Sequence, residues 1–226
     1  LKLRGTPYLE ILAQGGGILS TVRATRSASQ AELEAKGRRA LDEMLRLGTT
    51  TCEAKSGYGL DTETELKQLR AIRVLNGSHP VDLVPTFLGA HAVPEEYRED
   101  RAGYVRLVCE EMIPAATGEG LAKFCDVFCE TEVFSAGETR TILEAGLRHG
   151  LRPKIHADEI DAIGGSQLAR AVGAVSCKHL IVGPPEGLAA MAAAGTVAVL
   201  LPRNSLYLGA GRPPSRAMGG AGRTGA

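Results

Sequence analysis

Tryptophan is absent from this chain of 226 residues, and aromatic side chains make up only 4% of it. Charge of one sign is not in excess either, because 26 Lys and Arg residues balance 26 Asp and Glu residues. Proteins that bind nucleic acids need a basic surface, and those that bind single strands add aromatic side chains on which bases stack. We therefore expect no nucleic-acid partner and no attraction to an anionic membrane surface.

Long apolar runs are missing as well. No stretch approaches the roughly 18 residues of a transmembrane helix, and the first residues lack the pattern of a signal peptide. The five cysteines, an odd number, lie in apolar surroundings, as reduced cytoplasmic thiols usually do. Cys125 and Cys129 have no second Cys/His pair at zinc-finger spacing, which argues against a structural zinc site. We expect a cytoplasmic protein that does not enter a membrane.

The middle of the chain alternates between short apolar runs and helical patterns. Apolar runs of this length are typical of parallel strands that helices cover on both faces. Right-handed crossovers between such strands lead to a closed barrel or to an open doubly wound sheet. The predicted strands are Thr49–Glu53, Val81–Leu88, Phe124–Cys129, Leu151–His156, Ala174–Leu180 and Val197–Leu201.

The predicted helices carry start and stop signals. Capping-box spacing joins Ser29 to Glu32, Thr62 to Glu65 and Ser135 to Glu138, and an amphipathic helix is predicted over residues 95–115. Glycines suited to the left-handed backbone of a helix end stand at Gly48, Gly77 and Gly150.

The two ends of the chain differ from the middle. Residues 1–14 are predicted to form a helix that no strand precedes, and Gly209–Ala226 has the composition of a disordered tail. We therefore predict an α/β domain over residues 1–208, followed by that tail. Six strands cannot close a standard eight-stranded barrel, so the domain is predicted to be an incomplete (β/α) barrel.

Three of the five histidines follow predicted strands. His91, His156 and His179 come at carboxyl ends, where both candidate architectures collect their catalytic groups. Glu159 stands three residues after His156, so an imidazole and a proton-transferring carboxylate lie close together. His79 and His149 lie near predicted helix ends, which indicates a structural role.

Two further strand ends carry polar groups. Tyr58 lies between Gly57 and Gly59, in a loop that can bend sharply and present the phenol to a pocket. Glu130 ends another strand in a carboxylate.

These residues belong to stretches that closely resemble imidazolonepropionases, a family of the amidohydrolase superfamily. The resemblance runs from about Leu1 to Tyr207, and its motifs occur in the family's order. The motifs are YLEILAQGGGI (residues 8–18), KSGYGL (55–60), TFLGAH (86–91), DVFCE (126–130), HADE (156–159) and AVLLP (198–202).

The resemblance implies a metal-dependent TIM barrel that hydrolyses 4-imidazolone-5-propanoate to N-formimidoyl-L-glutamate in histidine degradation. It implies that His156 binds the metal, zinc or iron. Glu159 resembles the residue that contacts the substrate and helps to activate water, and His179 its acid–base or oxyanion partner. Tyr58 and His91 resemble substrate-binding residues. A homodimer is the candidate assembly.

The sequence departs from the family in ways that bear on activity. The family's first barrel strand ends in a His-x-His pair of metal ligands, and no His-x-His occurs here. The family's metal-binding Asp in an Asp-Phe-Asn-Pro-like context is not found either. Lys178 stands where the family has a small or acidic residue, and Arg203-Asn204-Ser205 replaces a Gly-Thr-type turn. We expect a chain truncated at both ends that binds metal poorly and is inactive alone.

Three alternatives stay open. One is another cyclic-amide hydrolase or deaminase of the superfamily. A second is a barrel lyase that forms a Schiff base through Lys154, which on a strand would face the same side as His156. The third is a non-catalytic fragment or interaction module.

Overall fold

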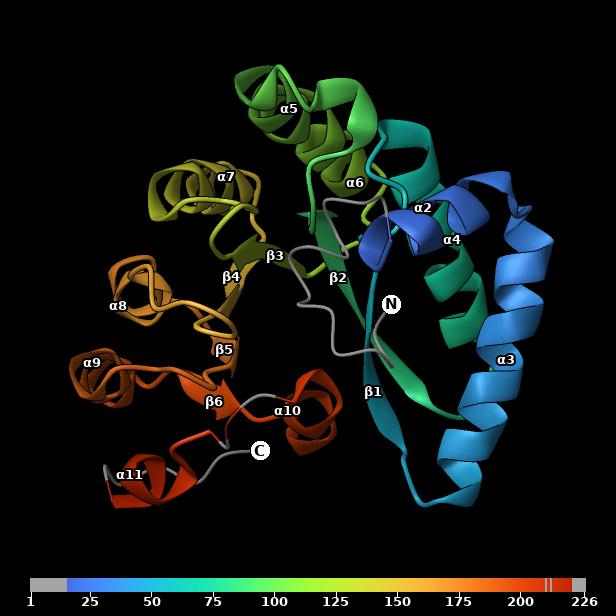
Figure 1. Ribbon diagram of the computed structural model, residues 1–226. Coiled ribbons are helices and arrows are strands. Elements are labelled where there is room, and N and C mark those ends of the chain that lie inside the picture. Colours follow the sequence, from blue (N-terminus) through green and yellow to red (C-terminus); the bar gives the residue numbers. More distant parts are fainter. Residues whose placement is uncertain (1–15, 210, 212, 221–226) are drawn as a thin grey trace. The chain divides into compact units, whose positions relative to one another are not determined.

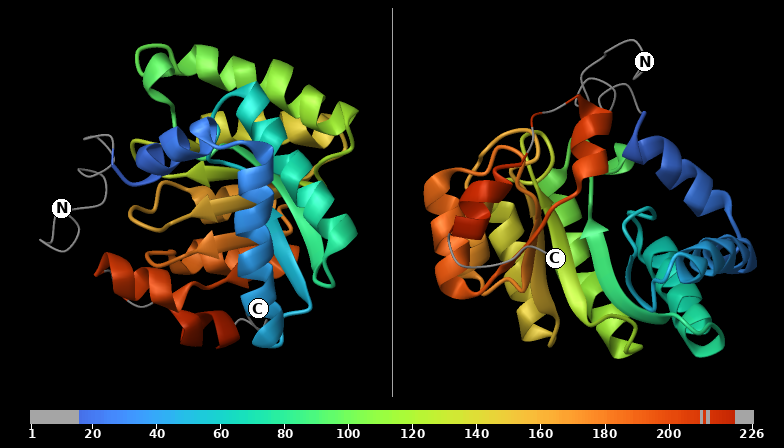
Figure 2. Two further views of the ribbon diagram at one scale, coloured as in Figure 1. Left: turned by 90° about the vertical axis from the view of Figure 1, so that its right-hand side faces the viewer. Right: turned by 90° about the horizontal axis from the view of Figure 1, so that it is seen from below.

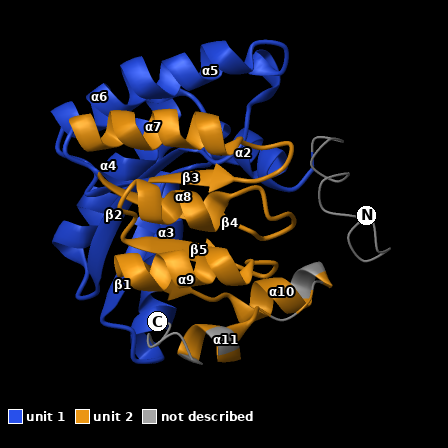
Figure 3. Cartoon of the chain, turned by 90° about the vertical axis from the view of Figure 1, so that its left-hand side faces the viewer, with its two compact units in different colours: residues 1–125, 149–151 blue, residues 126–148, 152–226 orange. Residues whose placement is uncertain are grey.

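The computed structural model describes residues 16–220 except 210 and 212, and the chain forms two compact units. The first comprises residues 1–125 and 149–151, and the second residues 126–148 and 152–226 (Figure 3). The helix predicted over residues 1–14 lies outside the described residues. Among the helices that the structure describes, none has the length and apolar character to cross a bilayer.

The first unit is built on the parallel strand pair β1–β2, in which Lys55 lies opposite Thr86. Helix α4 packs against both strands and α3 packs against α4 (Figure 1). The face of α4 that meets the strands buries Leu66, Leu69 and Ile72, which recur at helical spacing. The elements are α2 (Ile18–Ser27), α3 (Gln30–Arg46), β1 (Thr51–Lys55), α4 (Thr62–Ser78), β2 (Asp82–Ala90), the 3₁₀ turn η2 (Glu95–Tyr97), α5 (Arg101–Leu107), the π-helical segment η3 (Val108–Met112) and α6 (Ile113–Gly118).

The prediction of one regular helix over residues 95–115 is wrong in two respects. The α-helix starts later, and a π-helical segment interrupts it. The helix begins at Arg101 because the Asp100 side chain accepts the N–H of Gly103 at 2.8 Å. Pro114 offers no N–H to the preceding turn, and the turn before it widens into η3. The predicted apolar face is confirmed, since Tyr104, Val108 and Met112 are buried.

The second unit contains the parallel strands β4, β5 and β6, with His156 opposite Lys178 and Ala157 opposite His179. Helices α7, α8 and α9 alternate with these strands along the chain, and α8 packs against β4, β5 and α9 (Figure 2). Its elements are α7 (Ala136–Arg148), β4 (Arg152–Ala157), α8 (Gly165–Ala171), β5 (Ser176–His179), α9 (Pro185–Ala194), β6 (Val197–Val199), α10 (Pro202–Leu208) and α11 (Ser215–Gly220).

The predicted α/β class is confirmed. Strand β3 (Phe124–Cys129) spans the boundary of the two units, and the strand order follows the chain from β1 to β6. All six strands overlap their predicted ranges, although β1 and β5 begin two residues later than predicted and β6 ends two residues earlier. The short helix α11 falls within the predicted disordered tail.

The predicted capping boxes and helix-terminal glycines agree with the structure except in α4. Capping boxes close at Ser29–Glu32 and Ser135–Glu138, and Gly48 and Gly150 adopt positive φ. Gly77, in contrast, lies inside α4.

The Thr62–Glu65 capping box is also wrong. Asp61 caps α4 through the N–H of Thr64 at 2.7 Å, because the Glu65 carboxylate binds a neighbouring loop.

Candidate active site

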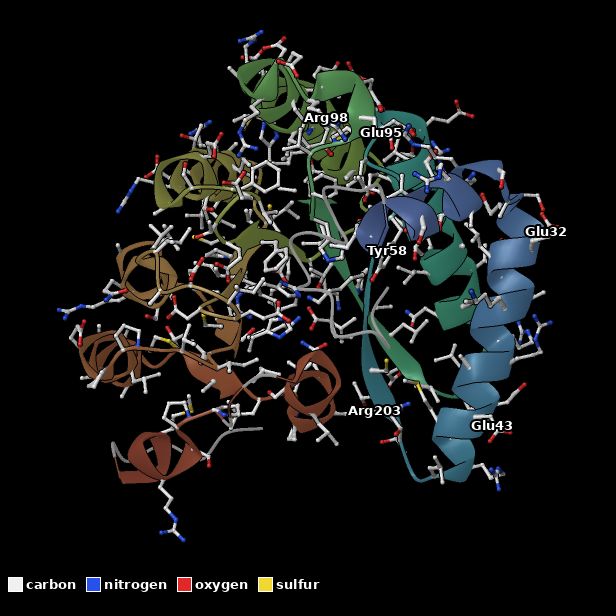
Figure 4. The ribbon with its side chains drawn as sticks, in the orientation of Figure 1. Glu32, Glu43, Tyr58, Glu95, Arg98 and Arg203 are labelled. Carbon is white, nitrogen blue, oxygen red and sulfur yellow. The ribbon has the colours of Figure 1, made fainter. Side chains whose placement is uncertain are left out.

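The structure places every predicted site residue at the carboxyl end of a strand or just after it. Tyr58 follows β1, as Figure 4 shows, and His91 follows β2; both belong to the first unit. His156 lies in β4, Glu159 two residues after that strand, and His179 ends β5; these three belong to the second unit. Each unit therefore carries one group of candidate residues.

In the second unit, Asp126 of β3 contacts one side chain of β4 and one of β5. Its Oδ1 lies 2.9 Å from Nδ1 of His156, and its Oδ2 lies 3.4 Å from Nζ of Lys178. All three side chains are buried. In the tautomer with the proton on Nδ1, the carboxylate fixes the imidazole ring and makes Nε2 more basic. A metal ion would therefore be bound through Nε2.

A second cluster of polar side chains lies beside the Asp126 cluster and consists of Glu159, His179 and Asn204. Oε1 of Glu159 lies 3.4 Å from Nδ1 of His179, and the Asn204 side chain donates to Glu159 and lies 3.3 Å from the same imidazole nitrogen. The rings of His156 and His179 have centroids 5.3 Å apart, and Phe128 packs edge-on against His156. The buried Glu159 carboxylate and His179 imidazole are both groups that can transfer protons, and they lie side by side.

The backbone of the strand-end loops is strained. Asp158, His179 and Leu180 have φ angles of 53°, 71° and 54°, in the left-handed region that residues other than glycine rarely adopt. Such strain persists only where the surrounding structure enforces it, and it collects at functional sites. The strained residues flank or include the two side chains that form the Glu159–His179 pair.

Glu130 holds the loop that follows β4. Its carboxylate accepts four backbone N–H groups, at distances of 2.8 to 3.1 Å, and three of them belong to residues 159–161. Burial raises the pKa of Glu130, and the four N–H groups oppose that rise.

In the first unit, Glu65 holds the loop of residues 56–60 in the same way. Its carboxylate accepts the N–H groups of Gly57, Gly59 and Leu60 at 2.8, 2.8 and 2.9 Å. Gly57 has a φ of 105°, and a Cβ on Gly59 would lie 2.7 Å from the backbone nitrogen of Glu65. Both glycines of the motif are therefore required by the geometry of the loop.

This loop presents Tyr58 to His91. The two rings meet edge to face with centroids 5.1 Å apart, and Nδ1 of His91 lies 2.9 Å from the carbonyl oxygen of Gly57, to which it donates. Gln68 accepts the N–H of Tyr58 at 3.3 Å. Burial raises the pKa of Tyr58, so the phenol keeps its proton at neutral pH and can donate a hydrogen bond.

The metal-binding potential of the described residues is limited. Across residues 16–220, less 210 and 212, no three His, Cys, Asp or Glu side chains are grouped so that they could hold a metal ion. Catalytic zinc sites use three protein ligands, so the described residues do not fit a complete metal site.

Asp126 and Asn204 are the site residues for which the sequence predicted no role. Asp126 is the one charged side chain within the apolar strand FCDVFC, and a fully buried charge inside a strand signals a partner. Asn204 lies in α10, which follows β6, and its sequence surroundings carry no comparable signal.

The architecture is similar to that of solved amidohydrolase-fold enzymes. A guanine deaminase from C. acetobutylicum matches with a TM-score of 0.66 at 13% identity, over 91% of this chain and 51% of that one. A zinc-bound adenosine deaminase from Xanthomonas campestris matches with a TM-score of 0.62 at 16% identity, over 95% of this chain and 48% of that one. The chain therefore has the amidohydrolase fold, in the form of an incomplete (β/α) barrel.

Sequence comparison narrows the class. The chain is 57% identical over 212 residues to the imidazolonepropionase of Alkaliphilus metalliredigens, which is 94% of this chain and 50% of that protein. It is 53% identical over 218 residues to that of Shouchella clausii, which is 96% of this chain and 49% of that protein. No family model matches the chain. The chain is thus similar in sequence to imidazolonepropionases over nearly its whole length, and it spans about half the length of these relatives.

Proposed function

We propose that this chain supplies the proton-transferring half of an enzyme that hydrolyses 4-imidazolone-5-propanoate to N-formimidoyl-L-glutamate. The observation that carries the proposal is the buried contact of Glu159 with His179 and Asn204, next to His156 on the neighbouring strand. The identity to imidazolonepropionases over nearly the whole chain supports the choice of substrate.

The proposed reaction opens the ring by adding water. Glu159 takes a proton from the water as its oxygen bonds to the ring carbonyl carbon. The carbon–nitrogen bond of the ring then breaks, and the proton passes to the departing nitrogen. His179 shares this proton with Glu159 across the 3.4 Å contact, or stabilises the oxyanion. Tyr58 binds the substrate through its phenol O–H, and His91 binds it through Nε2, which is an acceptor because Nδ1 donates to the Gly57 carbonyl.

A zinc or iron ion is part of the proposal, with His156 as one ligand. A bound metal ion lowers the pKa of water towards neutrality. The other ligands are not found among the described residues. A cytoplasmic location, a homodimer and the absence of a nucleic-acid partner stay predictions.

A hybrid enzyme provides the test. In this joined protein, the aligned residues of the chain replace the matching half of the Alkaliphilus metalliredigens imidazolonepropionase. Glu159→Gln keeps the side chain's size and removes the base, so turnover should fall by about a hundredfold or more. Asp161→Asn, which removes an exposed carboxylate from the same loop, is the matched control. Near-normal turnover of the Glu159→Gln protein would remove Glu159 from the mechanism.

A further inference from the structure

Glu130 occupies an unusual position for a carboxylate, since both of its oxygens accept backbone N–H groups. Oε2 accepts from Glu159 at 3.1 Å and from Ile160 at 2.9 Å. Oε1 accepts from Asp161 at 3.0 Å and from Thr131 at 2.8 Å. The side chain is 1% exposed and directly follows the last residue of β3.

Three successive N–H groups of residues 159–161 converge on this carboxylate. Asp158, the residue before them, has a φ of 53°, and this turn points the three groups in one direction. Buried N–H groups need acceptors, and a carboxylate that accepts several of them forms stronger bonds than a neutral group. Glu130 therefore fixes the path of the loop from inside the unit.

The fixed segment begins at Glu159, whose side chain contacts His179 and Asn204. Because its backbone N–H is bound to Glu130, the Cα of Glu159 has a defined position relative to the end of β3. The four N–H groups occupy both oxygens of Glu130.

We propose that Glu130 is a positioning residue, which sets the backbone of residues 159–161 and thereby the place of the Glu159 carboxylate against His179. The proposal deepens the proposed function and rests on it for the role of Glu159. The hydrogen bonds themselves do not depend on that function, so the two can be tested separately.

The first test measures amide hydrogen exchange in the 226-residue chain. Glu130→Gln keeps one carbonyl oxygen but turns an NH₂ group towards N–H donors, so exchange at Glu159, Ile160 and Asp161 should speed up by roughly ten- to a hundredfold. Glu132→Gln, a change of the same charge at an exposed position two residues away, should leave these amides unchanged. Unchanged protection in folded Glu130→Gln protein would overturn the proposal.

The second test measures kinetics in the joined protein. Glu130→Gln should lower kcat at least about tenfold with a smaller change in KM, because the base is misplaced while substrate contacts persist. It should also shift the acidic limb of the pH–rate profile, which a loss of stability alone would not move. If Glu130→Gln does not fold, Glu130→Asp, which keeps the charge but shortens the reach, is expected to show the same changes in weaker form.

The outcomes separate the two proposals. If the unmodified joined protein has no activity while the amide protection depends on Glu130, the proposed function is wrong. The result would still confirm that Glu130 fixes the loop of residues 159–161. If the joined protein is active and Glu130→Gln leaves kcat and the pH profile unchanged, the positioning role is wrong.

Discussion

At the residue scale, Asp126 is the side chain on which the second unit's polar interior depends. It is fully buried and contacts both the His156 imidazole and the Lys178 ammonium group. A buried charge that loses its partner is strongly destabilising, because the desolvation cost is no longer offset. The negative charge of Asp126 therefore stabilises Lys178 inside the unit as well as orienting the imidazole.

This pairing predicts the behaviour of two variants. Asp126→Asn should lower the free energy of unfolding by about 3 kcal/mol, measured by urea denaturation, because Lys178 stays buried without its counter-charge. Adding Lys178→Met should recover part of the loss, since it removes the buried cation that the Asp126 carboxylate contacted. Equal stability of the single variant and the parent chain would show that the Lys178–Asp126 contact contributes little.

The three histidines at strand ends could be predicted from sequence, because their position depends only on where the strands end. His91, His156 and His179 each follow an apolar run, and the structure places all three at strand ends. Asn204 could not be predicted, since its role depends on where α10 lies relative to Glu159, and local sequence does not encode that separation in space.

At the scale of elements, buried carboxylates hold two of the strand-end loops. Glu65 binds three N–H groups of residues 57–60, and Glu130 binds three of residues 159–161. In sequence, Glu65 has the spacing of a capping box, and that reading was wrong because the loop before the helix competes for the same carboxylate. The apolar periodicity of α4 was sufficient to predict the helix, but it could not show which N–H groups the Glu65 carboxylate accepts.

Glu65→Gln tests the loop of the first unit. The variant should increase hydrogen exchange at Gly57, Gly59 and Leu60 by roughly tenfold or more, because the new NH₂ group faces an N–H donor. It should also shift the NMR signal of His91, whose Nδ1 donates to the Gly57 carbonyl. Glu63→Gln, on an exposed position of the same helix turn, is the control. A loop that keeps its protection in the Glu65→Gln chain would contradict this reading.

At the scale of the whole molecule, the chain spans about half of the imidazolonepropionases that it matches. Strands β1 and β6 stand at the two ends of the strand order, and each has one neighbouring strand among the described residues. Strand edges without a partner tend to associate with other chains. The chain is therefore expected to be marginally stable or to associate when it is expressed by itself.

The 226-residue chain should also bind zinc or iron weakly and turn over no substrate. The reason is that His156 alone cannot provide the three protein ligands of a catalytic zinc site, and no His-x-His pair occurs in the sequence. Elemental mass spectrometry of the purified chain, together with an imidazolonepropionate assay, measures both quantities. Stoichiometric metal with measurable hydrolysis would show that other side chains complete the site.

Conversion of 4-imidazolone-5-propanoate by the joined protein is the most direct measurement of the central claim. We expect loss of the ultraviolet absorbance of the imidazolone, with N-formimidoyl-L-glutamate as the product identified by mass spectrometry. The parent Alkaliphilus metalliredigens enzyme sets the reference rate, and circular dichroism confirms folding. A folded joined protein that leaves the imidazolone unchanged would contradict the claim that residues of this chain carry out the proton transfers of that reaction.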